Sequence, residues 1–137
     1  MIEAAIRKIL ADAPAVVALV ADRITFVVAD QNERRPRLIL TLVSAVPGYC
    51  HDGKGGWVEG RMQCDCLAPT YPEAKTLAAA ARAALEEPEN YAGTVAGTEI
   101  LNLEIEDSHD VPMMPAEGRA TPATYGVSFD VRFLHRE

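Results

Sequence analysis

The chain has 137 residues, 49% of them hydrophobic, which is enough for one domain with its own core, without help from disulfides or metal. Its 13 Lys and Arg residues against 20 Asp and Glu residues give a formal net charge of −7. Proteins that bind nucleic acid tightly neutralise its phosphates with clustered basic side chains. The charge therefore excludes tight DNA binding, and we expect a single domain over residues 1–137.

The N-terminal residues lack the basic start, the continuous apolar run and the cleavage site of a secretory signal. Charged residues also interrupt the apolar region before it reaches the ~20 residues needed to cross a bilayer. We therefore expect a soluble protein that is not exported. Its three cysteines, Cys50, Cys64 and Cys66, are an odd number and fit free thiols better than a disulfide framework.

The first third of the chain predicts two helices followed by strands. Apolar spacing indicates a helix from residue 2 to about Asp12, and Pro14 suits the start of a second, short helix capped by Asp12 or Ala13. Residues 24–29 are β-branched and aromatic, which predicts a strand. A charged loop follows over residues 30–36.

A long hairpin is expected next. Residues 37–46 predict a strand with apolar side chains on both faces, so we expect both faces to be covered. Residues 47–56 hold Pro-Gly and several glycines, which suit a mobile hairpin tip. Residues 57–68 alternate and predict the returning strand, with Cys64 and Cys66 on its apolar face.

The strongest helix start is the capping box Thr70-x-x-Glu73, and its helix runs to about Glu86 with an apolar stripe of small side chains. A short hairpin turning at Gly97-Thr98 follows. Residues 100–106 predict a strand that buries Leu101, Leu103 and Ile105. Residues 107–122 predict a long mobile loop, and residues 125–133 a strongly alternating last strand. The fold class is α+β, a mostly antiparallel sheet with long hairpins covered by an N-terminal helix and one central Ala-rich helix.

A zinc site is the first chemical candidate, because Cys50-His51 and Cys64-x-Cys66 carry ligand types that neighbouring hairpin strands can bring together. The spacing is poor for zinc, since structural sites take paired ligands from a tight knuckle. We favour buried, structural thiols at Cys64 and Cys66.

Three further motifs are weak. Gly53-Lys54-Gly55-Gly56 lacks the Ser or Thr, the first glycine and the helix of a phosphate loop. Asp107, His109 and Asp110, with Ser108 among them, suggest a base and its orienting group, but no nucleophile elbow supports them. His135 lies on the apolar face of a strand, where a structural role is the default. The alternative hypothesis is a small cytoplasmic enzyme or ligand-binding module that uses the Cys/His groups or the cluster from Asp107 to Asp110.

Two predicted loops offer contact material for protein partners. One carries Lys54 and ends at Trp57, and the other carries Met113 and Met114 between prolines. Aromatic and methionine side chains are enriched at protein interfaces. These four residues are our candidates for an assembly interface, although the methionines would also suit a lid over the core.

The chain resembles the tail-completion family of long-tailed bacteriophages. The most specific part is the strand-to-helix passage from Gln63 to Ala74, and the resemblance extends in order and spacing from the N-terminal helix through the hairpin at residues 93–100 to the closing strand.

The resemblance implies a structural virion subunit without enzyme activity or cofactor. The family is expected to form a hexameric ring at the head-proximal end of the tail, which stops tube polymerisation and joins the tail to the head connector. The implied partners are further copies of the chain, a tail-tube protein and a head-completion protein. DNA is expected to pass through the lumen without specific binding, and no membrane is involved. Similar genes occur in prophages and gene-transfer particles.

Overall fold

The computed structural model describes residues 1–27, 36–87, 93–111 and 125–136. These hold three helices and six strands, in the order α1 (Ile2–Asp12), α2 (Pro14–Val20), β1 (Ile24–Phe26), β2 (Arg37–Cys50), β3 (Gly53–Ala68), α3 (Tyr71–Glu86), β4 (Gly93–Val95), β5 (Thr98–Val111) and β6 (Tyr125–Arg136). The predicted loop at residues 30–35 and the pair Met113 and Met114 lie outside the described residues.

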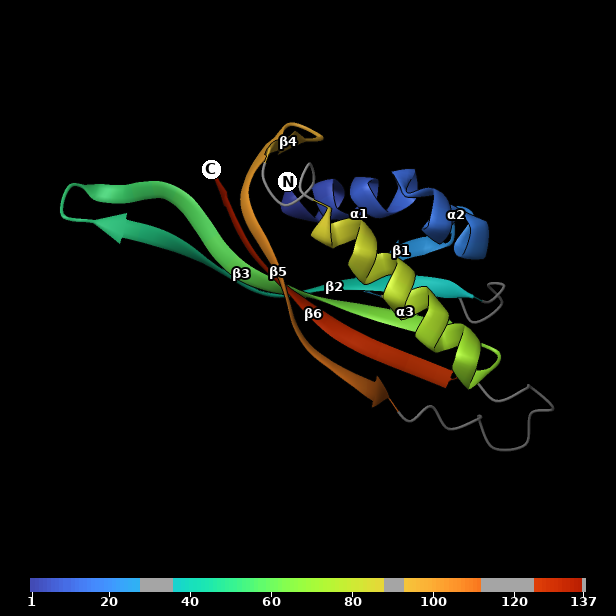
Figure 1. Ribbon diagram of the computed structural model, residues 1–137. Helices are drawn as coiled ribbons and strands as arrows, with labels where there is room; N and C mark the ends of the chain where they lie inside the picture. The colour runs from blue at the N-terminus through green and yellow to red at the C-terminus, as the bar shows by residue number, and fades with distance from the viewer. Residues whose placement is uncertain (28–35, 88–92, 112–124, 137) are drawn as a thin grey trace.

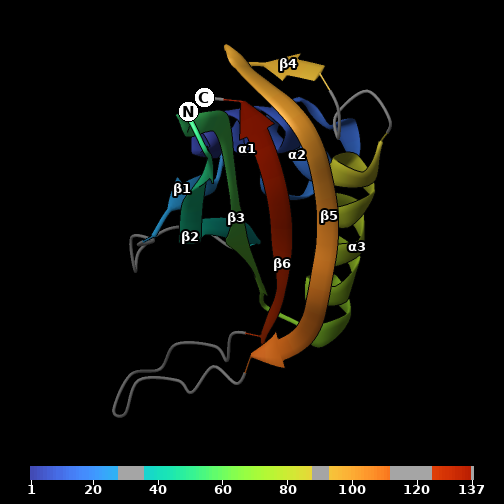
Figure 2. The ribbon, with the colours of Figure 1, turned by 90° about the vertical axis from the view of Figure 1, so that its left-hand side faces the viewer.

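The strands form one curled sheet in the order β1-β2-β3-β6-β5-β4 (Figures 1 and 2). β1 pairs in parallel with β2, and the other neighbouring pairs are antiparallel. The α+β class is confirmed, with a mixed sheet. Since β2, β3, β6 and β5 alternate in direction, β2 and β5 run oppositely on the two sides of the central strands.

All three helices lie on one face of this sheet (Figure 1). The core between the two layers combines apolar residues of the helices with those of the central strands. Phe129 and Phe133 of β6 are its largest fully buried side chains, and Cys64 and Cys66 of β3 are fully buried beside them. The opposite face of the sheet carries no helix in the described part of the chain.

The helix boundaries follow local chemistry. Thr70 caps α3, and its hydroxyl accepts a hydrogen bond from the Glu73 N–H at 3.4 Å. Ala13 is the N-cap of α2, without a side-chain cap. Asp12 instead pairs with Lys8 at 2.6 Å, so of the two predicted caps the structure has Ala13. None of the described helices is long and apolar enough to span a membrane.

Three strand predictions are wrong in detail. β2 buries Leu38 and Leu40 but exposes Leu42, because a register shift follows Leu42 and the strand then runs beyond the helices. β5 buries Ile100 and Leu103, since a bulge between Ile100 and Asn102 breaks the alternation that predicted a buried Leu101.

β5 also continues to Val111, paired with β6, so residues 107–111 are not a loop. The β4–β5 turn is at Ala96-Gly97, with Thr98 already in the strand.

Candidate assembly surface

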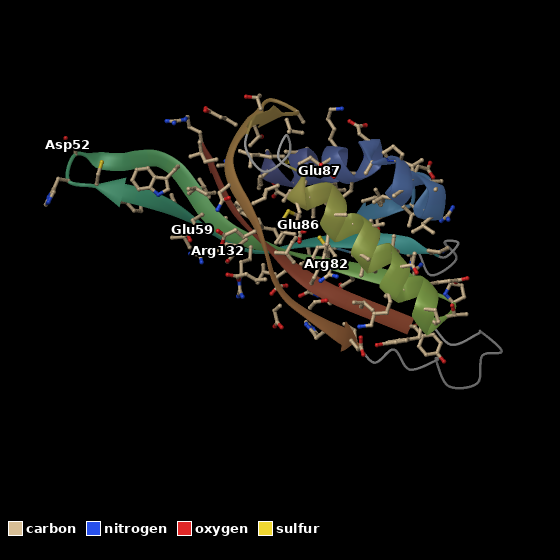
Figure 3. The ribbon with its side chains drawn as sticks, in the orientation of Figure 1. Asp52, Glu59, Arg82, Glu86, Glu87 and Arg132 are labelled. Carbon is tan, nitrogen blue, oxygen red and sulfur yellow. The ribbon has the colours of Figure 1, made fainter. Side chains whose placement is uncertain are left out.

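The most prominent feature is an arm formed by the outer part of the β2–β3 hairpin, residues 43–58. It projects away from the helices, with Asp52 at its tip (Figures 1 and 3). Residues predicted as a mobile tip are paired strand here, because Tyr49 lies opposite Lys54 and Cys50 opposite Gly53. The turn itself is His51-Asp52.

The arm exposes apolar side chains on a strand that is almost uncharged. Val46 is 62% exposed and Tyr49 is 68% exposed. After Arg37, β2 contains no charged residue. Apolar groups exposed on a projecting hairpin are a common sign of a protein-binding site. The arm therefore offers a surface that its own chain does not cover.

Trp57 stabilises the base of the arm. A Cβ atom added at Gly48 would lie 1.9 Å from the indole, and one added at Gly55 would lie 2.0 Å from it. The ring therefore lies flat against both glycines, one on each strand of the hairpin, and is only 36% exposed. A two-stranded hairpin is marginal alone in water, so this packing helps to hold the arm in one shape.

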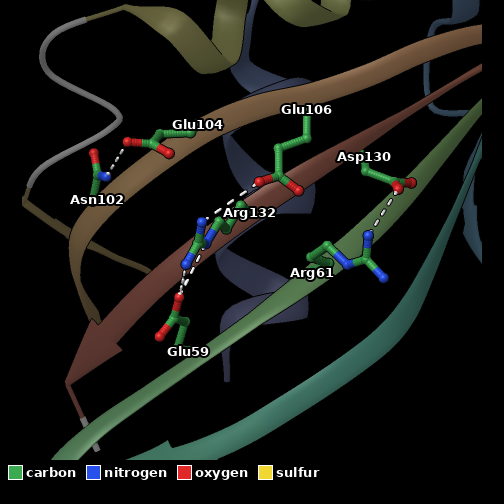
Figure 4. Close-up of polar contacts among 7 residues, drawn as sticks. All are labelled: Glu59, Arg61, Asn102, Glu104, Glu106, Asp130 and Arg132. Carbon is green, nitrogen blue, oxygen red and sulfur yellow. Dashed lines mark hydrogen bonds and ion pairs between the residues drawn. The ribbon is translucent and has the colours of Figure 1, made fainter.

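The uncovered face of the sheet is polar and carries a network of ion pairs (Figure 4). Arg132 of β6 donates to Glu59 of β3 and lies 3.6 Å from Glu106 of β5. The hydrogen bond with Glu59 raises the pKa of Arg132 above its ordinary value. Arg61 of β3 approaches Asp130 at 3.7 Å.

Carboxylates outnumber guanidinium groups on this face. Strand alternation and register place six acidic side chains there among the described residues, against Arg37, Arg61, Arg132 and Arg136: Glu59, Asp65, Glu99, Glu104, Glu106 and Asp130. The face therefore remains net negative after its ion pairs form. Such a surface repels phosphate and is a poor interface core, because charged residues are depleted there.

The structure separates the residues of the zinc hypothesis. Cys50 and His51 are exposed at the tip of the arm, whereas Cys64 and Cys66 are buried in the core. Gly53 lies opposite Cys50, and Cys64 follows Gly53 by eleven positions of strand, which is roughly 35 Å along β3. Burial raises the pKa of both core thiols well above the ordinary value. The predicted burial of Cys64 and Cys66 on the apolar face of the strand is confirmed.

The acidic cluster after residue 106 is divided between the two faces of β5. Asp110 accepts a hydrogen bond from the Tyr71 hydroxyl at 2.9 Å and pairs with Lys75 at 3.0 Å. These bonds lower the pKa of Asp110, the Lys75 bond most, and raise that of Lys75. Ser108 and Asp110 point to the helix side, opposite Phe129 and Val127, and His109 points to the other. Asp110 thereby ties the end of β5 to α3.

The glycine-rich segment, His135 and Trp57 are the other candidates from the sequence that the structure describes. Gly53-Lys54-Gly55-Gly56 is followed by strand, so it lacks the helix of a phosphate loop. His135 lies on β6 opposite Ile100, and its Nδ1 is 2.9 Å from the Arg136 carbonyl oxygen. Trp57 packs within the arm, with only part of its indole exposed. No set of three His, Cys, Asp or Glu residues in the described ranges is arranged to hold a metal ion.

Comparison with known proteins identifies the family. The sequence pattern of the family described as "Tail completion protein gp17" matches residues 4–136, which is almost the whole chain. The chain belongs to the tail completion family. It is therefore a structural protein of phage-type tails, and its place is the virion.

The fold of this tail completion protein also occurs in a solved particle. The chain is similar to a chain of the "Virion of native gene transfer agent (GTA) particle", with a TM-score of 0.73 over 98% of this chain and 94% of that one. The identity is 13%, so this likeness shows the fold alone. No curated protein matches the sequence.

Sequence reasoning missed the groups that define this surface. The sequence predicts Val46 at the end of an ordinary strand and Tyr49 in the hairpin tip. The absence of charged residues in β2 after Arg37 is a sequence signal that could have indicated the arm. The network around Arg132 gave no signal, because its members come from three strands whose register is not readable from the sequence.

Proposed function

We propose that this tail completion protein is the subunit of a ring, expected to contain six copies, at the head-proximal end of the tail. The ring ends polymerisation of the tail tube and joins the tail to the head connector. Its partners are further copies of the chain, the tail-tube protein and the head-completion protein. The family match over residues 4–136 supports the tail assignment, and the projecting arm is the observation that carries the ring.

The arm supports assembly for a physical reason. Val46 and Tyr49 remain exposed in the single subunit, and burying them between copies removes apolar surface from water. Because the arm projects to one side only, its contact on the next copy is made by a different surface. Such heterologous contacts, repeated by a rotation that closes, generate rings.

The acidic uncovered face supports passage of DNA. A ring threaded by a duplex needs an inner wall that does not hold phosphates, and the excess of carboxylates around Arg132 gives that property. The proposal includes no enzymatic step and no cofactor.

The test is the mass of the purified protein in solution. Size-exclusion chromatography with light scattering, at several concentrations, distinguishes a ring from a monomer. Replacing Val46 and Tyr49 with Ser is expected to abolish the ring while changing subunit stability by only ~0.5 kcal/mol, as for other surface substitutions. Val17→Ser, at an exposed position on α2, is the matched control. A monomer at every concentration, with and without tail-tube protein, contradicts the proposal.

A further inference from the structure

The sheet has two lateral edges that its own strands leave largely open. On one side β1 pairs only with Leu38–Leu40 of β2, and residues 41–50 have no outer neighbour in the described part of the chain. On the other side β4 pairs only with Thr98–Ile100 of β5, and among described residues none lies outside residues 101–111. Open strand edges present unpaired N–H and C=O groups to a partner.

The two edges differ strongly in charge. β5 carries five carboxylates and neither Lys nor Arg: Glu99, Glu104, Glu106, Asp107 and Asp110. The opposite edge holds Arg37 at the start of β2, Arg23 directly before β1, and Arg7 of α1, whose Nε donates to the Ile24 carbonyl. Arg23 likewise donates to the carbonyls of Pro36 and Leu19. One edge of the sheet is therefore acidic and the other is basic at one end.

Strand direction makes the edges compatible. Because β2 and β5 run oppositely, a second copy in the same orientation places its β5 antiparallel to β2 of the first. Residues that pair across β2, β3, β6 and β5 form rows perpendicular to the strands. Each row shows which residues of the two outer strands, β2 and β5, lie at the same height. Thr41 shares a row with Glu106, Ser44 shares one with Glu104, and Leu38, next to Arg37, shares one with Asp110.

We propose that the acidic β5 edge of one copy docks against the β1–β2 edge of the next, so that the sheet continues around the ring. The occupant of each edge is a second copy of this chain. Two β5 edges repel each other, whereas the unlike edges attract. This inference rests on the proposed function and adds to it the surface by which copies meet.

Main-chain pairing is interrupted along both edges, so complementary charge selects which edges pair. A register shift follows Leu42, Pro47 lacks an N–H, and β5 has shifts after Ile100 and after Glu106. Bulges and proline restrict main-chain pairing to short runs and protect an edge against unspecific partners. Complementary charges then select the correct neighbour.

Paired charge reversals test the interface. The first variant is Glu104→Lys with Asp107→Lys, and the second is Arg37→Glu with Ser44→Glu. Each alone is expected to form about tenfold fewer rings than wild type, measured by mass photometry. An equimolar mixture of the two variants, and a single chain with all four substitutions, should restore rings, because every interface again joins unlike charges.

The control reverses two carboxylates that belong to neither edge strand, Glu86→Lys with Glu87→Lys at the end of α3 (Figure 3). Circular dichroism verifies that each variant is folded. Normal rings from either edge variant alone, or no restoration in the mixture, overturn the interface and leave the proposed function standing. A wild type that forms no ring, alone or with tail-tube protein, overturns both.

Discussion

Placing a methyl group at Gly55 should release the arm from Trp57. The new Cβ of Gly55→Ala would lie 2.0 Å from the indole, and contacts below 3.0 Å do not occur, so the ring must leave its place. A packed Trp buries on the order of 150 Å². At ~25 cal/mol per Å² its displacement costs at most roughly 4 kcal/mol.

This loss should appear as local opening of the arm, because the contact lies beyond the helix-covered core. Trp57 is the only tryptophan, so its fluorescence reports the contact directly. We expect emission to shift to longer wavelength and hydrogen exchange to speed up over residues 47–58, with little change in the melting temperature. Gly53→Ala is the control for the emission alone, because its Cβ meets nothing within 4 Å and the indole stays in place, although a φ of +116° strains the turn. Unshifted emission in Gly55→Ala would refute the packing argument.

Three further predictions concern the body of the subunit. Ellman's reagent should titrate one thiol of the native protein, Cys50, and all three after denaturation, because burial keeps Cys64 and Cys66 protonated and inaccessible; rapid reaction of three native thiols would contradict this. Asp110→Asn should lower the melting temperature at pH 7 but not well below pH 3.8, the ordinary pKa of Asp. The pKa of Asp110 in the folded protein is lowered, so the stabilisation that its carboxylate gives is lost as the pH falls through this folded pKa. An equal deficit at both pH values would exclude this linkage. Thr70→Ala should cost about 1 kcal/mol in urea unfolding through loss of the α3 cap, whereas Thr70→Ser should cost much less.

Much of the fold follows from local sequence signals. The capping box at Thr70, the proline near the start of α2 and the alternation of β6 each fix an element within its own segment. Those signals predicted α2, α3 and the last strand, and the alternation of residues 57–68 predicted the burial of Cys64 and Cys66. They depend on neighbours a few residues away, which a single sequence displays.

Other features depend on contacts between distant segments. Residues 107–111 are polar and irregular, yet they form strand because β6 lies beside them and a bulge at Asp107, with φ of 44°, absorbs the broken alternation. The glycines of the arm predicted a mobile loop. The contact that orders them, with the Trp57 indole, forms only once the hairpin has brought its two strands together, so the sequence does not display it. The pairing of Asp110 with Tyr71 and Lys75 likewise requires the register of β5 against α3.

The proposed role in ending the tail tube can be measured as the length of the tubes. Tubes polymerised from the tail-tube protein of the same particle should be measured by electron microscopy with and without this protein. We expect that adding it stops elongation and leaves one ring at a single end of each tube. Tubes of unchanged length, with no added density at either end, would contradict the proposed role.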